Sequence, residues 1–186
     1  MTYTINLLDD STRPTAPKIE NVTPQQRRHG RRLAAIHAIH LRQISGVRRV
    51  LGEVAEGVRA VADLPGAVSS LTMIQNIRLS GSICGEECRM LTFHHTAEDQ
   101  WIFPALNGHN DGLTRVVERL AEEHLIIHAL IERLETSAAE VMAAPTPVNF
   151  HTLKISFDQL EAVVRSHFNY EQEELEEALG FFDVDL

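Results

Sequence analysis

Four long segments of the chain repeat apolar residues at alternating steps of three and four, and this spacing limits the possible folds most strongly. The first segment begins after Thr23 and Pro24, which are typical of a helix N-cap and of the first helical position. Its stripe consists of Leu33, His37, His40, Ile44, Val47, Leu51, Val54 and Val58. The stripe predicts one long amphipathic helix that ends before Leu64-Pro65-Gly66.

Three further helices are predicted from the same spacing, with helix-breaking residues between them. The second is expected from about residues 71–79 to about residue 103, the third from residue 111 toward residue 141, and the fourth from residue 149 to residue 179. The expected caps and stops are Pro104, Asn107-Gly108, Asp111, Asn149 and Gly180.

No strand pattern competes with these helices, and the links between them are short. The sequence therefore predicts an all-α, up-down-up-down four-helix bundle over residues 25–180. Residues 1–24 are polar and contain Pro14 and Pro17, so we expect an irregular N-terminal arm. Residues 181–186 form a C-terminal tail.

Charge and composition limit the kinds of partner and the cellular location that the chain is expected to have. The net charge of −9 argues against a nucleic-acid surface. No apolar run reaches the roughly 18 residues of a membrane span, and the N-terminus lacks a signal pattern. Cys84 and Cys88 are expected to be reduced core residues, so we predict a cytoplasmic protein. An arginine-rich early segment and a glutamate-rich C-terminus are expected to attract each other as helix faces.

Polar residues capable of binding metal recur on the apolar faces. Three pairs stand four residues apart, namely His94 with Glu98, His124 with His128, and His167 with Glu171. Such a pair projects from one helix face on successive turns. The first helix adds His37 and His40, and the sequence alone leaves open which of these two takes part.

The predicted heights of these residues bring them together. In an antiparallel bundle all of them fall at one level, roughly 15 Å from one end at 1.5 Å per residue. Buried carboxylates and imidazoles without partners cost several kcal/mol each, so a cation is expected to satisfy them. Imidazole and carboxylate ligands suit iron, zinc or copper, and seven ligands exceed the four of a tetrahedral zinc site. Two metal ions bridged by Glu98 and Glu171 account for the number.

Other side chains are assigned less direct roles. His95 follows His94 and turns roughly 100° away on a helix, so we expect it to lie outside the ligand set, as a supporting or interhelical contact. Surface or capping roles are expected for His29, His109 and His151. Trp101 and Phe103 are expected in the core. Tyr170 is expected to pack in the core or on the surface, with a redox or supporting role beside the next residue, Glu171, as the alternative.

The stretch His94-His95-Thr96-Ala97-Glu98-Asp99, followed by Ile102-Phe103-Pro104-Ala105-Leu106, resembles the second helix of HHE-type hemerythrin-like proteins. Glu123-His124 with His128, and His167-Phe168-Asn169-Tyr170-Glu171, resemble their third and fourth helices. The resemblance covers about residues 25–179 and implies a non-haem di-iron site with an oxo or hydroxo bridge. The ligands it implies are His94, Glu98, His124, His128, His167, Glu171 and one histidine of the first helix, with His37 preferred and His40 open.

Two features depart from the oxygen-carrying hemerythrins. Those proteins place an aspartate five residues after the histidine, whereas Glu171 stands four after His167, and the arm before residue 25 is extra. Both departures argue against plain oxygen carriage as the expected function. No Glu stands three residues before a His, which disfavours ferritin-type chemistry, and His-Glu-x-x-His is absent, which argues against a zinc protease.

Three functions remain open. In the first, the site binds O2, nitric oxide or peroxide for sensing, storage or protection. In the second, it is an enzyme of peroxide dismutation, nitric-oxide chemistry or small-substrate oxidation. In the third, the chain sequesters metal or holds partners together. A histidine-rich centre favours the first, because fewer anionic ligands stabilise high-valent iron less. With the first function, the expected partner is a small molecule, and no organic cofactor is expected. The sequence leaves the oligomeric state and the physiological ligand open.

Overall fold

The computed structural model describes residues 5–62 and 87–186, and every regular element in that part of the chain is helical. Two short helices, η1 and α1, precede the long α2. The bounds are η1 (Asp10–Thr12), α1 (Pro24–Gly30), α2 (Arg32–Ala62), a helical stretch over residues 87–97, the π-helical segment η2 (Glu98–Ile102), α4 (Phe103–Leu106), α5 (Asp111–Ala143) and α6 (Pro147–Phe181).

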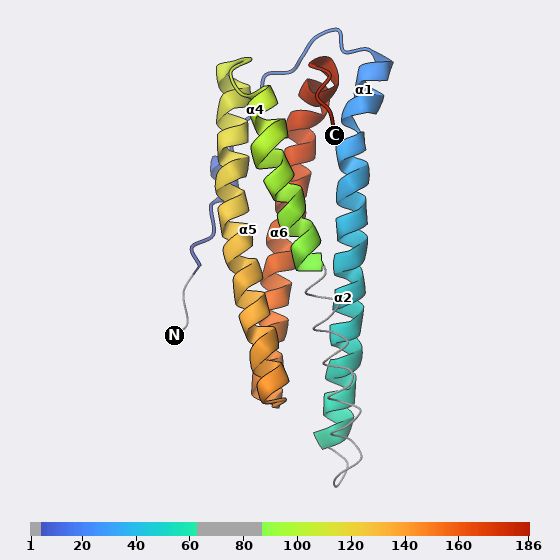
Figure 1. Cartoon of the computed structure of the whole chain (residues 1–186), viewed down its shortest axis with the longest axis vertical. Helices are drawn as coiled ribbons and strands as arrows, with labels where there is room; N and C mark the ends of the chain where they lie inside the picture. Colours follow the sequence, from blue (N-terminus) through green and yellow to red (C-terminus); the bar gives the residue numbers. More distant parts are fainter. Residues whose placement is uncertain (1–4, 63–86) are drawn as a thin grey trace.

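The long helices lie side by side and alternate in direction (Figure 1). In that view α2 descends, the helix through η2 and α4 rises, α5 descends and α6 rises. This arrangement confirms the predicted up-down-up-down four-helix bundle. The predicted start of the second helix lies outside the described residues. Before α1, the N-terminal arm runs along the side of α5 and crosses the top of the bundle.

The predicted start of the first helix is confirmed, whereas its continuity is not. Thr23 caps α1 through its hydroxyl, and the Gln26 side chain accepts from the Thr23 backbone N–H in return, with Pro24 in the first turn. The chain then turns at Arg31, so the single helix expected from residue 25 is two helices, α1 and α2.

Three predicted helix boundaries were wrong by a few residues. Asn110, not Asp111, caps α5, since its side chain accepts from the Leu113 backbone N–H. Thr146, not Asn149, caps α6, because Pro147 directly after it fits the first helical position. Gly180 does not stop α6, which continues to Phe181.

Gly180 is needed for a close approach of helices instead. A Cβ atom at Gly180 would overlap the carbonyl oxygen of Gln26 in α1, and one at Gly30 would overlap that of Glu176 in α6. The two backbones therefore touch at reciprocal glycines. Beside them Arg31 Nε lies 3.0 Å from Glu176 Oε1, so the attraction expected between arginine-rich and glutamate-rich faces is present.

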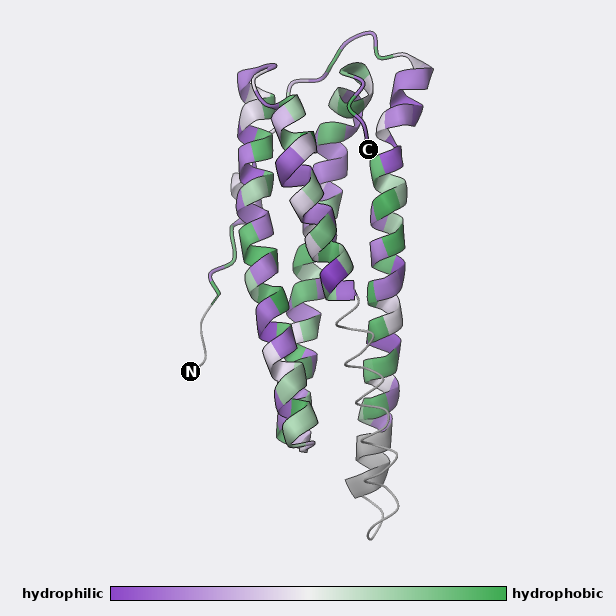
Figure 2. Cartoon of the chain, in the orientation of Figure 1, coloured by the Kyte–Doolittle hydropathy of each residue, from purple (hydrophilic) through white to green (hydrophobic). Residues whose placement is uncertain are grey.

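The apolar core is divided in two (Figure 2 shows the hydropathy along each helix). One cluster includes Ile44, Leu91, Ile127 and Val164, and the other includes Leu33, Ile102, Leu120 and Leu175. Along each long helix, one member of each cluster flanks the histidines and glutamates predicted as ligands. A polar layer thus separates the two halves of the core.

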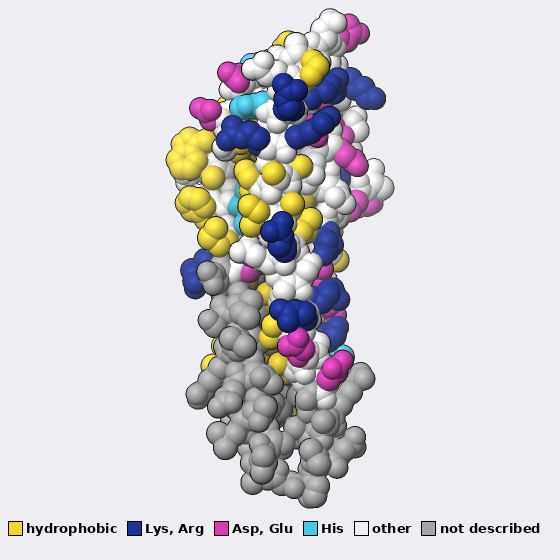
Figure 3. Space-filling model, turned by 90° about the vertical axis from the view of Figure 1, so that its right-hand side faces the viewer, with side chains coloured by type: hydrophobic (Ala, Val, Ile, Leu, Met, Phe, Trp, Pro, Cys, Tyr) yellow, Lys and Arg dark blue, Asp and Glu magenta, His cyan; other side chains and the backbone are white. Residues whose placement is uncertain are grey.

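Of two aromatic residues near this layer, one is buried and the other is exposed. Phe103 is buried, as predicted, but Trp101 is 64% exposed, so its predicted place in the core was wrong. Figure 3 shows hydrophobic side chains gathered beside lysines and arginines on one face of the molecule.

Cys88 is buried, as expected of a core residue, and Cys84 lies outside the described residues.

Candidate metal centre

The second helix supplies the centre with two adjacent histidines and one glutamate. The His94 ring meets the His37 ring of α2 edge-on at 5.0 Å, and the His95 ring stacks on His124 of α5 at 4.1 Å. Because the helix packs between two neighbours, consecutive residues reach both of them. Glu98 opens the π-helical segment, an irregularity that is frequent at functional sites.

One group of four donors comes from three helices. His37, His94, Glu98 and Glu171 each offer one atom, and these atoms lie within 4.8 Å of one another. Nε2 of His37 is 3.2 Å from Glu171 and 3.8 Å from Glu98. Nε2 of His94 is 3.1 Å from the same Glu98 oxygen, Oε1. Three of the four side chains are fully buried, and His94 is nearly so.

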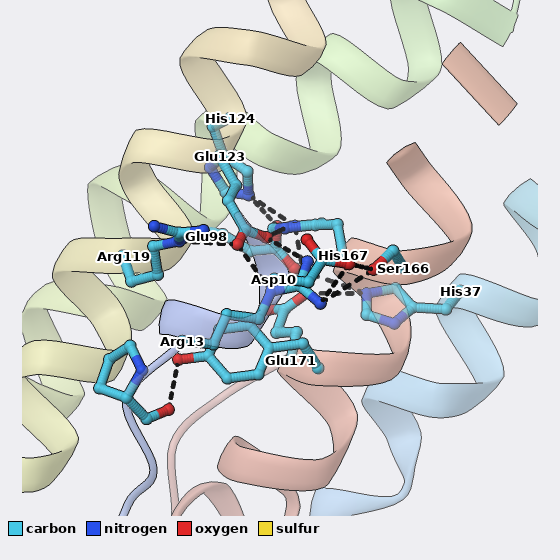
Figure 4. Close-up of polar contacts among 12 residues, drawn as sticks. Asp10, Arg13, His37, Glu98, Arg119, Glu123, His124, Ser166, His167 and Glu171 are labelled. Atoms are coloured by element: carbon cyan, nitrogen blue, oxygen red, sulfur yellow. Dashed lines mark hydrogen bonds and ion pairs between the residues drawn. The ribbon is translucent and has the colours of Figure 1, made fainter. Parts of the chain in front are cut away.

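A second group consists of His95, His124 and His167, whose donor atoms also lie within 4.8 Å of one another. The other oxygen of Glu98, Oε2, is 3.5 Å from Nε2 of His124. Oε2 of Glu171 is 3.8 Å from Nε2 of His167. Each carboxylate therefore reaches both groups, and Figure 4 shows Glu98 and Glu171 in one cluster with His37, His124 and His167.

Outer partners fix the rings of the central histidines. Nδ1 of His124 lies 2.8 Å from Asp99 Oδ1, and Nδ1 of His167 lies 3.0 Å from Glu123 Oε2. Since ionised carboxylates only accept hydrogen bonds, both Nδ1 atoms donate. In the neutral rings both Nε2 atoms then carry lone pairs toward the centre. Such carboxylate–histidine pairs commonly orient metal ligands.

The Nε2 atoms of His124 and His167 lie only 3.1 Å apart. With both protons on the Nδ1 atoms, neither Nε2 can donate to the other, and two lone pairs face each other. A cation between or beside them removes this repulsion. Around His37 the constraint is looser, because the Gln172 side-chain amide stands 2.9 Å from its Nδ1 and an amide can present nitrogen or oxygen there.

Burial controls the protonation of the centre. It lowers the pKa of His94 to about 3 and lowers the pKa values of His95 and His167 as well, so these rings stay neutral and able to bind metal. Burial and the nearby Glu171 carboxylate raise the pKa of Glu98 well above its usual range. For Glu171, burial acts upward, but His37, His167 and His94 outweigh it and lower its pKa.

The donor atoms fit a metal ion. Among the described residues, the buried polar atoms without a hydrogen-bond partner include Nε2 of His37, Nε2 of His94, both ring nitrogens of His95, both carboxylate oxygens of Glu98 and both of Glu171. Buried polar groups are otherwise almost always satisfied, and each unsatisfied group costs about 1–3 kcal/mol. Imidazole nitrogens and carboxylate oxygens are ligands that iron and zinc accept.

Two predicted ligands lie apart from both groups. Nδ1 of His40 is 3.0 Å from Glu87 Oε1, and its ring lies 4.9 Å from the His94 ring. His128 is half-buried, with its ring 5.8 Å from that of His95 and its Nε2 buried without a partner. His95, which was predicted to lie outside the ligand set, belongs to the second group of converging donor atoms.

The remaining histidines lie at the ends of the bundle or on its surface, as predicted. Nε2 of His29 is 2.6 Å from the Val184 carbonyl oxygen, and the His109 ring stacks on Phe182 at 3.6 Å. His151 is exposed. No separate role was predicted for Asp99, Glu123 or Gln172, although each of the three directly adjoins a predicted ligand. That adjacency was the available signal.

A family model described as hemerythrin HHE cation binding domain matches residues 31–179, which is well over half of the chain. The chain belongs to the hemerythrin HHE cation-binding family. The HHE family is cation-binding, and the two groups of histidines and glutamates are compatible with a metal site. No curated protein and no solved structure gives a significant match. None of the described helices is long and apolar enough to cross a membrane.

Proposed function

We propose that this HHE-family chain binds two iron ions in its polar layer and through them binds or reacts with O2, nitric oxide or peroxide. The observation that carries the proposal is the position of Glu98 and Glu171, each of which reaches histidines of both groups. A single ion would leave one group of buried histidines unsatisfied. Two ions sharing two carboxylates satisfy both groups.

The ligand roles follow from the groups. His37 and His94 would hold one ion, and His124 and His167 would hold the other, with Glu98 and Glu171 bridging. The second ion has two further candidate ligands in His95, by distance, and His128, by its unpartnered Nε2. His40 would support the site from outside through Glu87.

When bound, iron supplies the affinity for O2, nitric oxide or peroxide and the electrons for any reaction. The chain's own residues orient the ligands and exclude water. The Phe168 ring stacks on His37 at 3.8 Å, and Phe103 stacks on His124 at 5.3 Å. Leu91, Leu120 and Ile127 are buried within a turn of candidate ligands. Apolar walls of this kind admit diatomic molecules and peroxide more readily than large polar substrates.

We further propose binding, rather than turnover, as the principal role. The two groups together contain five histidines and two carboxylates, and few anionic ligands stabilise high-valent iron less. Storage, sensing or protection would follow from reversible binding. An enzyme that dismutates peroxide or oxidises a small substrate would instead consume its ligand repeatedly.

The test is anaerobic loading with Fe2+, followed by elemental analysis and stopped-flow mixing with O2, nitric oxide and peroxide. We expect about two irons per chain and a spectral change with at least one of the three, stable for minutes. His94→Ala and His167→Ala should lose iron, whereas the exposed His151→Ala should keep it. One tightly bound zinc with iron rejected, or two irons indifferent to all three molecules, would contradict the proposal.

A further inference from the structure

Among the described residues of the N-terminal arm, Arg13 contacts Glu123, and Glu123 in turn contacts the candidate ligand His167. We propose that Arg13 is a positioning residue, which fixes the Glu123 carboxylate against His167 and thereby makes metal binding depend on the docked arm. The inference rests on the metal binding proposed above. It extends that proposal to a segment that precedes the matched family domain, which begins at residue 31.

Arg13 and Glu123 form a two-pronged ion pair between the arm and α5. Nε of Arg13 lies 2.8 Å from Oε1 of Glu123, and Nη2 lies 2.9 Å from Oε2. The side chains are only 14% and 6% exposed, so solvent screens the pair little. A planar guanidinium fixes the direction of a carboxylate in this geometry, which a lysine cannot reproduce.

The same carboxylate holds His167. Oε2 of Glu123, the oxygen that accepts from Arg13 Nη2, also accepts from Nδ1 of His167 at 3.0 Å. A carboxylate held in place at Nδ1 keeps the Nε2 side of the His167 ring directed at the centre.

Arg119 supports only half of this arrangement. Its Nε lies 2.9 Å from Oε1 of Glu123, whereas Oε2 receives its hydrogen bonds from Arg13 and His167. Loss of Arg13 would therefore leave the oxygen that faces His167 without its guanidinium and free the carboxylate to rotate. Arg119 alone does not replace the fork.

Several contacts around Arg13 hold the N-terminal arm against α6. Nη1 of Arg13 donates to the Ser166 hydroxyl at 2.9 Å, and Ser166 in turn donates to Asp10 at 2.5 Å. The Arg13 guanidinium lies 4.7 Å from the centre of the Tyr170 ring, and the Tyr170 hydroxyl donates to the Pro14 carbonyl oxygen at 2.8 Å. Figure 4 shows the arm residues Asp10 and Arg13 beside Ser166, Glu123 and His167. Because Ser166 directly precedes His167, the arm contacts the ligand's own helix turn.

Co2+ binding to the full chain tests this inference, because its visible bands report ligand geometry independently of any reaction. We expect Arg13→Met to weaken one of two bound Co2+ ions about tenfold, the lower end of the range for residues that orient ligands, and to alter the visible spectrum. Glu123→Gln should do the same. The double variant should be no weaker than Glu123→Gln alone, since both changes remove one interaction.

Arg27→Met is the matched control, because Arg27 also pairs with a glutamate, Glu177 of α6, but none of the described hydrogen bonds or ion pairs joins that glutamate to a histidine. It should leave both Co2+ affinities and the spectrum unchanged. Arg13→Lys keeps the charge and covers the case in which Arg13→Met does not fold; it should weaken binding less. Wild-type affinity and spectrum in both Arg13 variants, or additive losses in the double variant, would overturn the inference. A wild-type chain that binds no Co2+ would instead overturn the metal-binding proposal itself.

Discussion

One carboxylate oxygen of Glu171 lies 3.2 Å from Nε2 of His37 in the fully buried middle of the bundle. No corresponding contact joins His40 to this carboxylate among the described ion pairs, since His40 faces Glu87 at 3.0 Å. The two histidines of α2, which the sequence could not separate, therefore occupy different environments. Only His37 belongs to a group of converging donors.

We therefore predict that His37→Ala loses at least one of two iron ions, whereas His40→Ala retains both. The reason is that the first change removes a converging donor and the second removes a contact to Glu87 outside the group. Elemental analysis after anaerobic reconstitution measures the difference. Equal loss from both variants would mean that His40 also binds metal.

The second ion offers a comparable choice between His95 and His128. His95 converges with His124 and His167, whereas His128 lies outside that group. We expect His95→Ala to weaken the second metal ion more than His128→Ala does, by about tenfold in affinity, the scale on which single contacts to a metal site are felt. Competitive Zn2+ titration of each variant gives the constants. The opposite order would assign the ligand to His128.

Stability of the metal-free protein should depend on pH. His94 has a pKa near 6.5 when unfolded but about 3 when folded, and His95 and His167 are lowered too. The unfolded chain thus binds protons that the folded chain excludes. The contribution of these histidines to the free energy of unfolding is therefore fully present above about pH 6.5 and is lost as the pH falls toward 3. Glu98, with its raised pKa, acts in the opposite direction, but it is one group against three.

We expect the midpoint temperature of thermal unfolding of the metal-free chain to decrease as the pH is lowered from about 7.5 to about 5. This range lies above the one in which ordinary carboxylates titrate. His94→Gln, which cannot be protonated there, should flatten this dependence, and the exposed His151→Gln should not. A midpoint that stays constant or rises on acidification would show that the three buried histidines do not control stability.

Glycines provide a test of the α1–α6 contact. Gly30→Ala and Gly180→Ala should each destabilise the fold by about 1–3 kcal/mol, because the new methyl group overlaps a backbone carbonyl of the other helix. Gly52→Ala is the control, since nothing lies within 4 Å of its added Cβ in α2. That change should stabilise by about 0.5–1 kcal/mol. Denaturant unfolding distinguishes the two signs, and equal effects would contradict the close approach.

The helix count, the order of directions and the convergence of the polar residues could be predicted from periodicity alone. Helix boundaries were less accessible, because neighbouring residues such as Asn110 and Asp111 can both cap a helix N-terminus. Gly180 was predicted as a helix stop, but a glycine is needed there because the Gln26 backbone lies against it. Gln26 is more than 150 residues away in the chain, so the local sequence pattern does not reveal this contact.

Trp101 was misplaced, whereas His95 makes the predicted interhelical contact but lies nearer the centre than expected. A rotation of about 100° turns His95 away from the face of His94, but a helix between two neighbours uses a wide face, and the His95 ring stacks on His124. Trp101 lies within the π-helical segment, where the helix departs from the regular 3.6-residue repeat on which the core prediction rested. The role of Arg13 could not be found from the sequence, because its partners Glu123 and Ser166 lie more than 100 residues away in the chain.

The polar layer between the two apolar clusters has a consequence for how the helices align. Apolar stripes alone tolerate sliding one helix past another by a full turn, since leucine, isoleucine and valine are nearly interchangeable as neighbours. Sliding here would set His37, Glu98 or His124 against hydrocarbon and leave the buried charges unmatched. The layer therefore selects a single vertical alignment of four helices, much as one buried polar residue selects the register of a coiled coil.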